Sequence, residues 1–154
     1  MGKADLNPIT TAHFLPVGDE NAPRGRLSLD GLDGAVEIPG CILEGAWRID
    51  CHFLIATTDD ITSEDQLHFL LLNSRAEFID QVTLGAVYST GVFAASHPKG
   101  ARLSFRFFGD TTWTLTVLPS PSFRVPILGD PRGVHRPFSF RTRLRIEGRP
   151  KPGV

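Results

Sequence analysis

The stretch 102-RLSFRFFGDTTWTLTVLP-119 alternates apolar and polar side chains twice, once on each side of Gly109 and Asp110. Alternation with a period of two is typical of a strand with one face in a core, and Gly-Asp between two such runs predicts a hairpin turn. We expect Phe107 to face Trp113 across this turn. One face of the hairpin then carries every large apolar side chain: Leu103, Phe105, Phe107, Trp113, Leu115 and Val117.

Two segments upstream, 48–57 and 67–88, also favour antiparallel strands, because they are rich in apolar residues between turn signals. Ser63 and Gln66 form a capping box ahead of a leucine-rich run, so a short helix over 64–73 is the alternative. We favour the strand, because 73-NSRA-76 is typical of a hairpin turn.

The upstream strands are apolar on both faces, unlike the hairpin at 102–119. One face includes Phe53, Ile55 and Cys51, and we expect Cys51 to be a small core residue. A sheet with two apolar faces must be covered on both, by a second layer of the same chain or by another subunit. We expect another subunit and predict a homo-oligomer, with a dimer favoured. Its interface would include Leu54, Leu70, Leu72, Phe78 and Val82.

The chain as a whole has the composition of an all-β domain. Twelve prolines and fifteen glycines separate short alternating segments, and 154 residues suit one domain. We expect a single domain over 1–154, with a proline-containing entry segment at 1–24 and a loose tail at 148–154. Because successive strands are joined by short connections, we predict a mostly antiparallel meander closed as a single β-barrel, with a two-sheet β-sandwich as the alternative.

A closed barrel of this kind resembles lipocalin-type and allene-oxide-cyclase-type barrels in its architecture alone. A hollow interior would bind a small apolar or amphipathic ligand, whose anionic head an arginine would meet. Polar residues at the barrel mouth, such as Glu44, Tyr88 and His97, would serve a cofactor-free cyclase or isomerase. The interior would be packed or lined by seven aromatic side chains: Phe53, Phe69, Phe105, Phe107, Trp113, Phe138 and Phe140.

The short motifs of the common enzyme classes are missing from the sequence. It has no Gly-x-Ser-x-Gly, no Walker loop, no Gly-x-Gly-x-x-Gly, no Cys-x-x-Cys and no His-Glu-x-x-His. We therefore expect no cofactor, and an enzyme is less favoured than a binding or interaction protein. No catalytic residue can be assigned.

The histidines and acidic residues do not predict a metal site. His52 and His68 would share a strand face with Asp50 nearby if a hairpin were centred near Ile61, but no further ligand has a defined spacing. The acidic loop 57-TTDDITSEDQ-66 matches no calcium-loop spacing, so we interpret it as a solvated turn. Cys51 and His52 are neighbours along a strand and should point to opposite faces, which argues against a thiol–imidazole pair.

The chain carries no segment typical of membrane insertion or export. No apolar run approaches the ~20 residues that cross a bilayer, and the first residues lack the apolar core of a secretory signal. We expect a cytoplasmic protein outside the membrane. Cys41 and Cys51 are the only cysteines and are expected to be reduced thiols.

The stretch 136-RPFSFRTRLRIEGRPK-151 has the alternation of an amphipathic strand, with Arg141, Arg143 and Arg145 on one face. The first 77 residues carry 13 acidic and 5 basic side chains and the rest carry 4 and 11, so the halves have net charges of −8 and +7. Such halves attract each other, and we expect these arginines to form cross-strand ion pairs or to lie in the subunit interface. Because the whole chain has a net charge of −1, nucleic acid is an unlikely partner.

Three hypotheses for the function follow. The first is a non-enzymatic protein that acts through interaction or oligomer formation. A barrel that binds a small apolar or amphipathic ligand comes close behind it. A cofactor-free cyclase or isomerase is the third.

Overall fold

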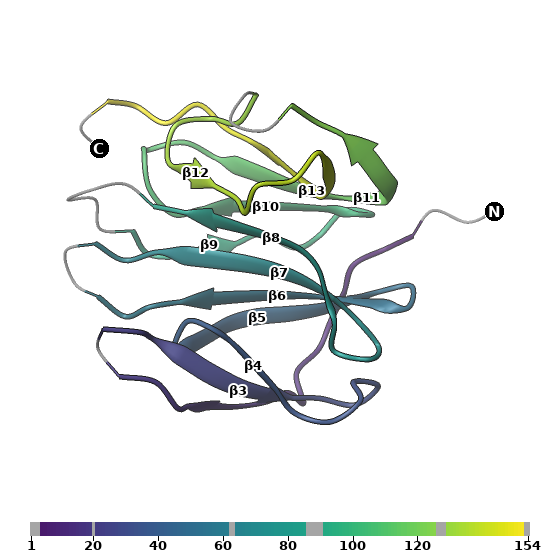
Figure 1. Ribbon diagram of the computed structural model, residues 1–154. Coiled ribbons are helices and arrows are strands. Elements are labelled where there is room, and N and C mark those ends of the chain that lie inside the picture. Colours follow the sequence, from purple (N-terminus) through teal and green to yellow (C-terminus); the bar gives the residue numbers. More distant parts are fainter. Residues whose placement is uncertain (1–3, 20, 62–63, 86–90, 126–128, 153–154) are drawn as a thin grey trace.

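A computed structural model describes residues 4–19, 21–61, 64–85, 91–125 and 129–152. These residues form thirteen strands in three antiparallel sheets, and no helix among them is long and apolar enough to span a membrane (Figure 1). The strands are β1 (Asn7–Pro8), β2 (His13–Pro16), β3 (Arg24–Ser28), β4 (Val36–Pro39), β5 (Ile42–Ile49), β6 (His52–Thr58), β7 (Leu67–Asn73), β8 (Phe78–Leu84), β9 (Ala94–Ala95), β10 (Arg102–Arg106), β11 (Trp113–Phe123), β12 (Val134–His135) and β13 (Arg141–Glu147).

The sheets form three layers, and the middle layer is the largest. This central sheet has the order β1-β5-β6-β7-β8-β12, and β5 to β8 follow one another as hairpins. A four-stranded sheet, β13-β11-β10-β9, packs on one of its faces, and a three-stranded sheet, β2-β3-β4, packs on the other (Figure 1). The central sheet therefore divides the hydrophobic core in two.

The prediction of a single barrel is wrong, because none of the three sheets closes on itself in the described part of the chain. The sandwich alternative is nearer, with one layer more than expected. The chain passes from the three-stranded sheet into the central sheet at Gly40, which follows Pro39 and has a φ of 93°. A Cβ at this position would lie 2.4 Å from Oγ1 of Thr57, so the close approach of β4 to β6 requires glycine. Strands on the two sides of this turn belong to different sheets.

Both apolar faces of the central sheet are covered within one chain. Leu54 and Val82 pack towards the four-stranded sheet, whereas Leu70 and Leu72 pack towards the three-stranded sheet. All four are fully buried, so they leave no apolar face for a second subunit. The sequence argument for an oligomer rested on that uncovered face, and it no longer holds. Phe78, at the start of β8, stays 46% exposed.

Strand β7 confirms the strand interpretation of 67–73 over the helix, and the hairpin turn at 73–76 is also confirmed. Asn73 Oδ1 accepts hydrogen bonds from the backbone N–H groups of Arg75 and Glu77, both at 3.0 Å. Ala76 has a φ of 60° in this turn. The local asparagine cap thus fixes the geometry that the sequence indicated.

The hairpin at 102–119 is confirmed, but its register is wrong by two residues. Phe105 pairs with Trp113 and Leu103 pairs with Leu115, so Phe107 lies in the loop. The loop folds inwards: Phe107 and Phe108 are buried, and the carbonyl of Phe108 accepts the Trp113 Nε1–H at 3.0 Å. Because the shift is even, the large apolar side chains still share one face.

The two ends of the chain are tied to the sheets. Within the entry segment 1–24, β1 pairs with β5 and β2 pairs with β3. In the tail 148–154, Lys151 donates its backbone N–H to the carbonyl of Gly109 at 2.8 Å. Regular structure begins at β1, and this hydrogen bond joins the C-terminal segment to the loop between β10 and β11.

Replacement of Trp113 by alanine should lower the free energy of unfolding by about 3–5 kcal/mol. Trp113 is fully buried and packs against Phe105 and Phe108, with ring centroids 6.5 and 5.2 Å away. Urea denaturation followed by circular dichroism measures the loss. Thr114→Ala on the outer face is the control and should change the midpoint little. A loss below about 1 kcal/mol for Trp113→Ala would contradict this packing.

Candidate functional site: an aromatic arm and a groove

A two-stranded arm extends from the four-stranded sheet. Strand β10 is paired with β11 only as far as Thr116, and after an irregularity between Val117 and Ser122 the far part of β11 pairs with the start of β13. Residues 119–123 are all exposed. We call residues 119–125 and 138–142 the aromatic arm.

Three phenylalanines gather on the aromatic arm and face solvent. Phe123, Phe138 and Phe140 are 74%, 73% and 54% exposed. The rings of Phe123 and Phe140 are stacked at a centroid distance of 6.4 Å, and Phe138 meets Phe140 edge-on at 5.4 Å. Val125, which is 51% exposed, lies two residues beyond Phe123. Clustered exposed apolar side chains of this kind are typical of interaction surfaces.

A network of charged groups beneath the arm fixes its base. Arg136 donates to both carboxylate oxygens of Asp130, at 2.9 and 3.2 Å, and Arg124 donates to the same carboxylate at 2.8 Å. Arg136 also donates to the hydroxyl of Thr142 at 2.9 Å. Its side chain is only 6% exposed, which makes these contacts strong and their geometry well defined.

Asp80 of β8 joins the central sheet to β13. Its Oδ2 accepts the backbone N–H groups of Arg143 and Leu144 at 2.8 and 2.9 Å, and the hydroxyl of Thr142 at 2.9 Å. This carboxylate satisfies donors along the edge of β13. Sequence reasoning missed it, because 62 residues separate Asp80 from Thr142 and no local pattern links them. The only signal was an aspartate within the basic half of the chain.

The arginines of β13 do not form the expected cross-strand ion pairs. Among the described residues, no carboxylate lies within ion-pair distance of Arg141, Arg143 or Arg145. Arg145 pairs across the sheet with Thr116, which pairs in turn with Arg102. Arg141 is paired with Phe123 on the arm. The outer surface around the arm therefore carries positive charge that these residues leave uncompensated.

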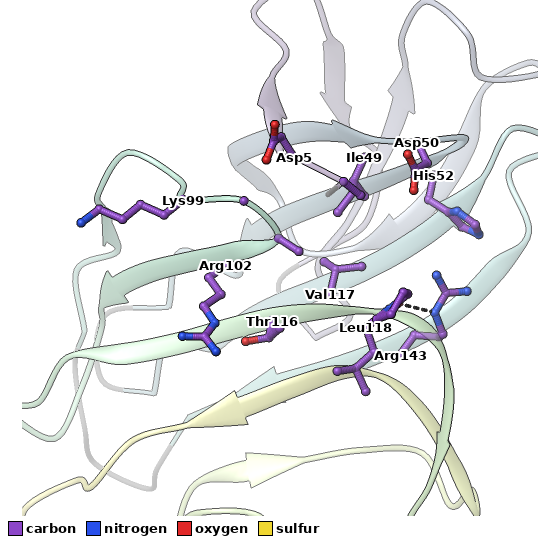
Figure 2. A pocket seen from close by; sticks show the side chains of 14 residues that line it. Asp5, Ile49, Asp50, His52, Lys99, Arg102, Thr116, Val117, Leu118 and Arg143 are labelled. Atoms are coloured by element: carbon purple, nitrogen blue, oxygen red, sulfur yellow. Dashed lines mark hydrogen bonds between the residues drawn. The ribbon is translucent and has the colours of Figure 1, made fainter. Parts of the chain in front are cut away.

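A groove of about 940 Å³ lies where the central and four-stranded sheets meet the N-terminal segment (Figure 2). It is lined by residues 4–5, 49–50, 99–102 and 116–119 together with His52 and Arg143. Ile49, Val117 and Leu118, which are mostly buried, give it an apolar floor. Charged and polar side chains stand around that floor.

One end of the groove brings His52 of β6 opposite Arg143 of β13, and Figure 2 shows the two side chains pointing towards one another, with Asp50 beside His52. The Nε of Arg143 donates to the carbonyl of Leu118 at 2.8 Å, which orients the guanidinium. Burial, and after it the charge of Arg143, lowers the pKa of His52, against an opposing effect of Asp50.

No protein-family model, curated protein or solved structure matches this chain.

The seven aromatic residues expected inside a barrel are distributed over three places. Four of them, Phe69, Phe105, Phe107 and Trp113, pack in the core under the four-stranded sheet, and Phe53 packs in the other core. Phe138 and Phe140 are exposed on the arm. No common cavity gathers these seven side chains.

Cys51 corrects the sequence interpretation in two ways. It is exposed and lies in the turn between β5 and β6, where Asp50 has a φ of 51°, so it is not a core residue. A turn residue does not obey the alternation of a strand, and the Sγ of Cys51 comes within 3.6 Å of Nδ1 of His52.

Cys41, the other cysteine, is half-buried next to the acidic loop. Burial, reinforced by Asp60, Asp59 and Asp65, raises the pKa of its thiol.

His52 and His68 are not neighbours across the hairpin of β6 and β7. β6 pairs with β7 so that His52 lies opposite Asn73 and His68 lies opposite Thr57, which separates the histidines along the hairpin. His68 instead bonds Asp59 at 2.8 Å and Thr83 at 2.9 Å. Among the residues that the structure describes, no three His, Cys, Asp or Glu side chains are grouped to hold a metal ion.

The acidic loop is organised by its own backbone. Asp65 Oδ1 accepts the N–H groups of Asp59, Asp60 and Gln66 at 3.0–3.1 Å. Burial is the main cause that raises the pKa of Asp65.

Two of the residues named for an enzyme, Glu44 and His97, lie away from the groove. Glu44 accepts a hydrogen bond from Thr58 at 2.8 Å, and neither it nor the exposed His97 lines the groove. Tyr88 lies outside the described residues.

Proposed function

We propose that the protein is a non-enzymatic interaction protein that binds an acidic partner segment with apolar side chains through its aromatic arm. The observation that carries the proposal is the contact cluster of Phe123, Phe138 and Phe140, each more than half exposed. A fully exposed aromatic ring gains stability when it enters a partner's apolar surface, because burial is worth about 25 cal/mol per Å².

The base of the arm is held in place before any partner arrives. Arg124 and Arg136 converge on Asp130, and Arg124 also donates its backbone N–H to the carbonyl of Phe140 at 2.8 Å. Aromatic side chains on a fixed scaffold lose little conformational freedom on binding, which favours affinity. This arrangement supports an arm that acts as a ready-made contact surface.

Charge selects an acidic partner over a second copy of the chain. Arg141 lies beside Phe123 in the sheet register, with Arg145 further along the same strand. In a two-fold dimer formed through the arm, both copies would bring these arginines into one interface, and like charges near the axis would repel each other. Carboxylates on a different partner would compensate them. Self-association remains an outcome that the test below separates.

Nucleic acid is the less suitable partner for this surface. Bases would need free ring faces on which to stack, whereas the ring of Phe140 already contacts Phe123 and Phe138. The cytoplasmic location expected from the sequence stays a prediction.

A synthetic peptide that alternates glutamate with leucine or phenylalanine should bind the protein, and Phe123→Ser with Phe140→Ser should weaken this binding at least about tenfold. Fluorescence anisotropy of the labelled peptide measures it. Leu15→Ser, which changes a 60% exposed apolar residue on β2, is the matched control and should leave binding unchanged. Raising the salt concentration should weaken binding, because Arg141 contributes through charge.

Two further measurements distinguish the acidic partner from other partners. Light scattering behind a sizing column should give the monomer mass of 16.9 kDa at micromolar concentration. A dimer that the two serine substitutions dissociate would replace the acidic partner by a second copy. Tighter binding of single-stranded oligothymidylate than of the acidic peptide would also overturn the proposal, as would equal peptide binding by wild type and the double variant.

A further inference from the structure

We propose that the groove is a binding site for a small amphipathic organic anion, with the anionic head between His52 and Arg143 and the apolar tail on Ile49, Val117 and Leu118. The groove adjoins the aromatic arm at Pro119, but none of the three arm phenylalanines lines it, and it does not depend on the proposed partner. It also differs from the barrel interior that the sequence suggested, since its residues come from the rims of two sheets.

The head site is formed by two nitrogen-bearing side chains that face one another. His52 lies on β6 and Arg143 on β13, and both line the same end of the groove (Figure 2). Two such donors converging from different sheets are the arrangement that a carboxylate requires, because each of its oxygens can accept from one of them.

Arg143 is oriented for this role by the backbone. Its Nε–H donates a hydrogen bond to the carbonyl of Leu118 at 2.8 Å, which leaves the terminal nitrogens of the guanidinium for another acceptor. No carboxylate of the described chain reaches Arg143 within ion-pair distance. Asp80, the nearest acidic contact, accepts its backbone N–H instead of its side chain.

The surroundings of His52 suit an imidazole that takes up a proton when a carboxylate binds beside it. The groups that face it are Asp50 and the Cys51 thiol from the turn before β6, and Arg143 from β13. Burial and Arg143 lower its pKa, so the free imidazole is mainly neutral at pH 7. A bound carboxylate would stabilise the imidazolium, and ligand uptake would be coupled to proton uptake.

The floor selects an apolar tail. Ile49 and Val117 are each 4% exposed and Leu118 is 8% exposed, so only small parts of these side chains face the groove. Ala4, Ala101 and Pro119 add apolar surface beside them. A short aliphatic chain lying on this surface would add affinity in proportion to its buried area. The geometry therefore favours a carboxylate with a medium-length chain over a bare anion.

Sodium octanoate is the probe, and NMR of the histidine side chains is the measurement. The His52 signal, assigned by its loss in His52→Gln, should shift saturably with a dissociation constant of ~1 mM or tighter. The pKa of His52 should rise when octanoate is bound. Butyrate and inorganic phosphate should bind at least about tenfold more weakly, because neither covers the apolar floor.

Arg143→Gln should weaken octanoate binding at least about tenfold, whereas Arg145→Gln, two residues along the same strand and outside the groove, should not. Arg143→Lys keeps the charge but not the planar fork, and should bind with intermediate affinity. Both glutamine variants should keep the wild-type circular dichroism spectrum.

Several results would overturn this inference: no saturable shift of His52 at millimolar octanoate, equal losses for Arg143→Gln and Arg145→Gln, or phosphate binding as tightly as octanoate. The variant with Phe123→Ser and Phe140→Ser should bind octanoate normally. Failure of the acidic peptide to bind the arm would therefore leave the groove result untouched, and the reverse also holds.

Discussion

Leu72→Arg is expected to prevent folding. Leu72 is fully buried in the core between the central and three-stranded sheets, where it lies among side chains such as Phe53 and Ile38. Arginine there would lose the leucine contacts and bury a charge without a partner, at a cost of at least about 5 kcal/mol. This approaches the whole stability of a typical domain. Far-UV circular dichroism and urea denaturation should show loss of the cooperative transition.

Phe78→Arg is the matched control for this substitution. Phe78 is paired with Leu72 on the neighbouring strand but is 46% exposed, so its arginine variant can keep the charge in water. It should fold with a cooperative transition. If Leu72→Arg instead kept the wild-type midpoint and only changed the molecular mass in solution, the three-stranded sheet would not cover this face.

Asp80→Ala is expected to lower the free energy of unfolding by about 3–5 kcal/mol. The substitution removes the acceptor of two backbone N–H groups on β13 and of the Thr142 hydroxyl. It also removes a carboxylate that lies 3.9 Å from the buried guanidinium of Arg136. The unsatisfied donors make this loss large for a single side chain.

Asp110→Ala provides the comparison, because Asp110 has two ionic partners but is exposed. It contacts Arg106 and Lys151, each at 3.0 Å, and all three side chains are more than half exposed. The urea midpoint should fall far less than for Asp80→Ala, and its small loss should come mainly from placing alanine at the φ of 48° that Asp110 adopts. Asp80→Asn, which keeps one acceptor oxygen, should fall between Asp80→Ala and wild type. Equal midpoints for Asp80→Ala and Asp110→Ala would show that Asp80 does not hold β13.

Local patterns predicted the strands well because their causes are local. The alternation around Gly109 and the asparagine turn at Asn73 both act within a few residues, and both hairpins are present in the structure. The register of the first was wrong because the inward fold of Phe107 and Phe108 has no signal in alternation. Period alone cannot distinguish a strand residue from a buried loop residue.

The number of layers could not be predicted in the same way. The apolar residues on both faces of β6 and β7 correctly indicated that both faces are buried. The strands that bury one of these faces, β3 and β4, have only five and four residues and lie before a Pro-Gly break. A second subunit satisfied the same pattern equally well. The choice between the two depends on long-range packing, which short-range sequence patterns do not contain.

The candidate sites were the least predictable part. Phe138 and Phe140 have the same parity as the buried Leu144 and Ile146, so alternation placed them in the core. They are exposed because only β11 and β13 extend into the arm, whereas β10 is paired with β11 no further than Thr116. The groove joins residues from five distant parts of the chain, and only the fold brings His52 to Arg143.

The division of the core by the central sheet has a consequence for cooperativity. Neighbouring residues of β6 and β7 belong to different cores: Leu54 and Leu71 to one, Ile55 and Leu70 to the other. A displacement of either strand disturbs the packing on both of its sides at once. We therefore expect loss of packing in one core to weaken the other, and the three layers to unfold in a single step.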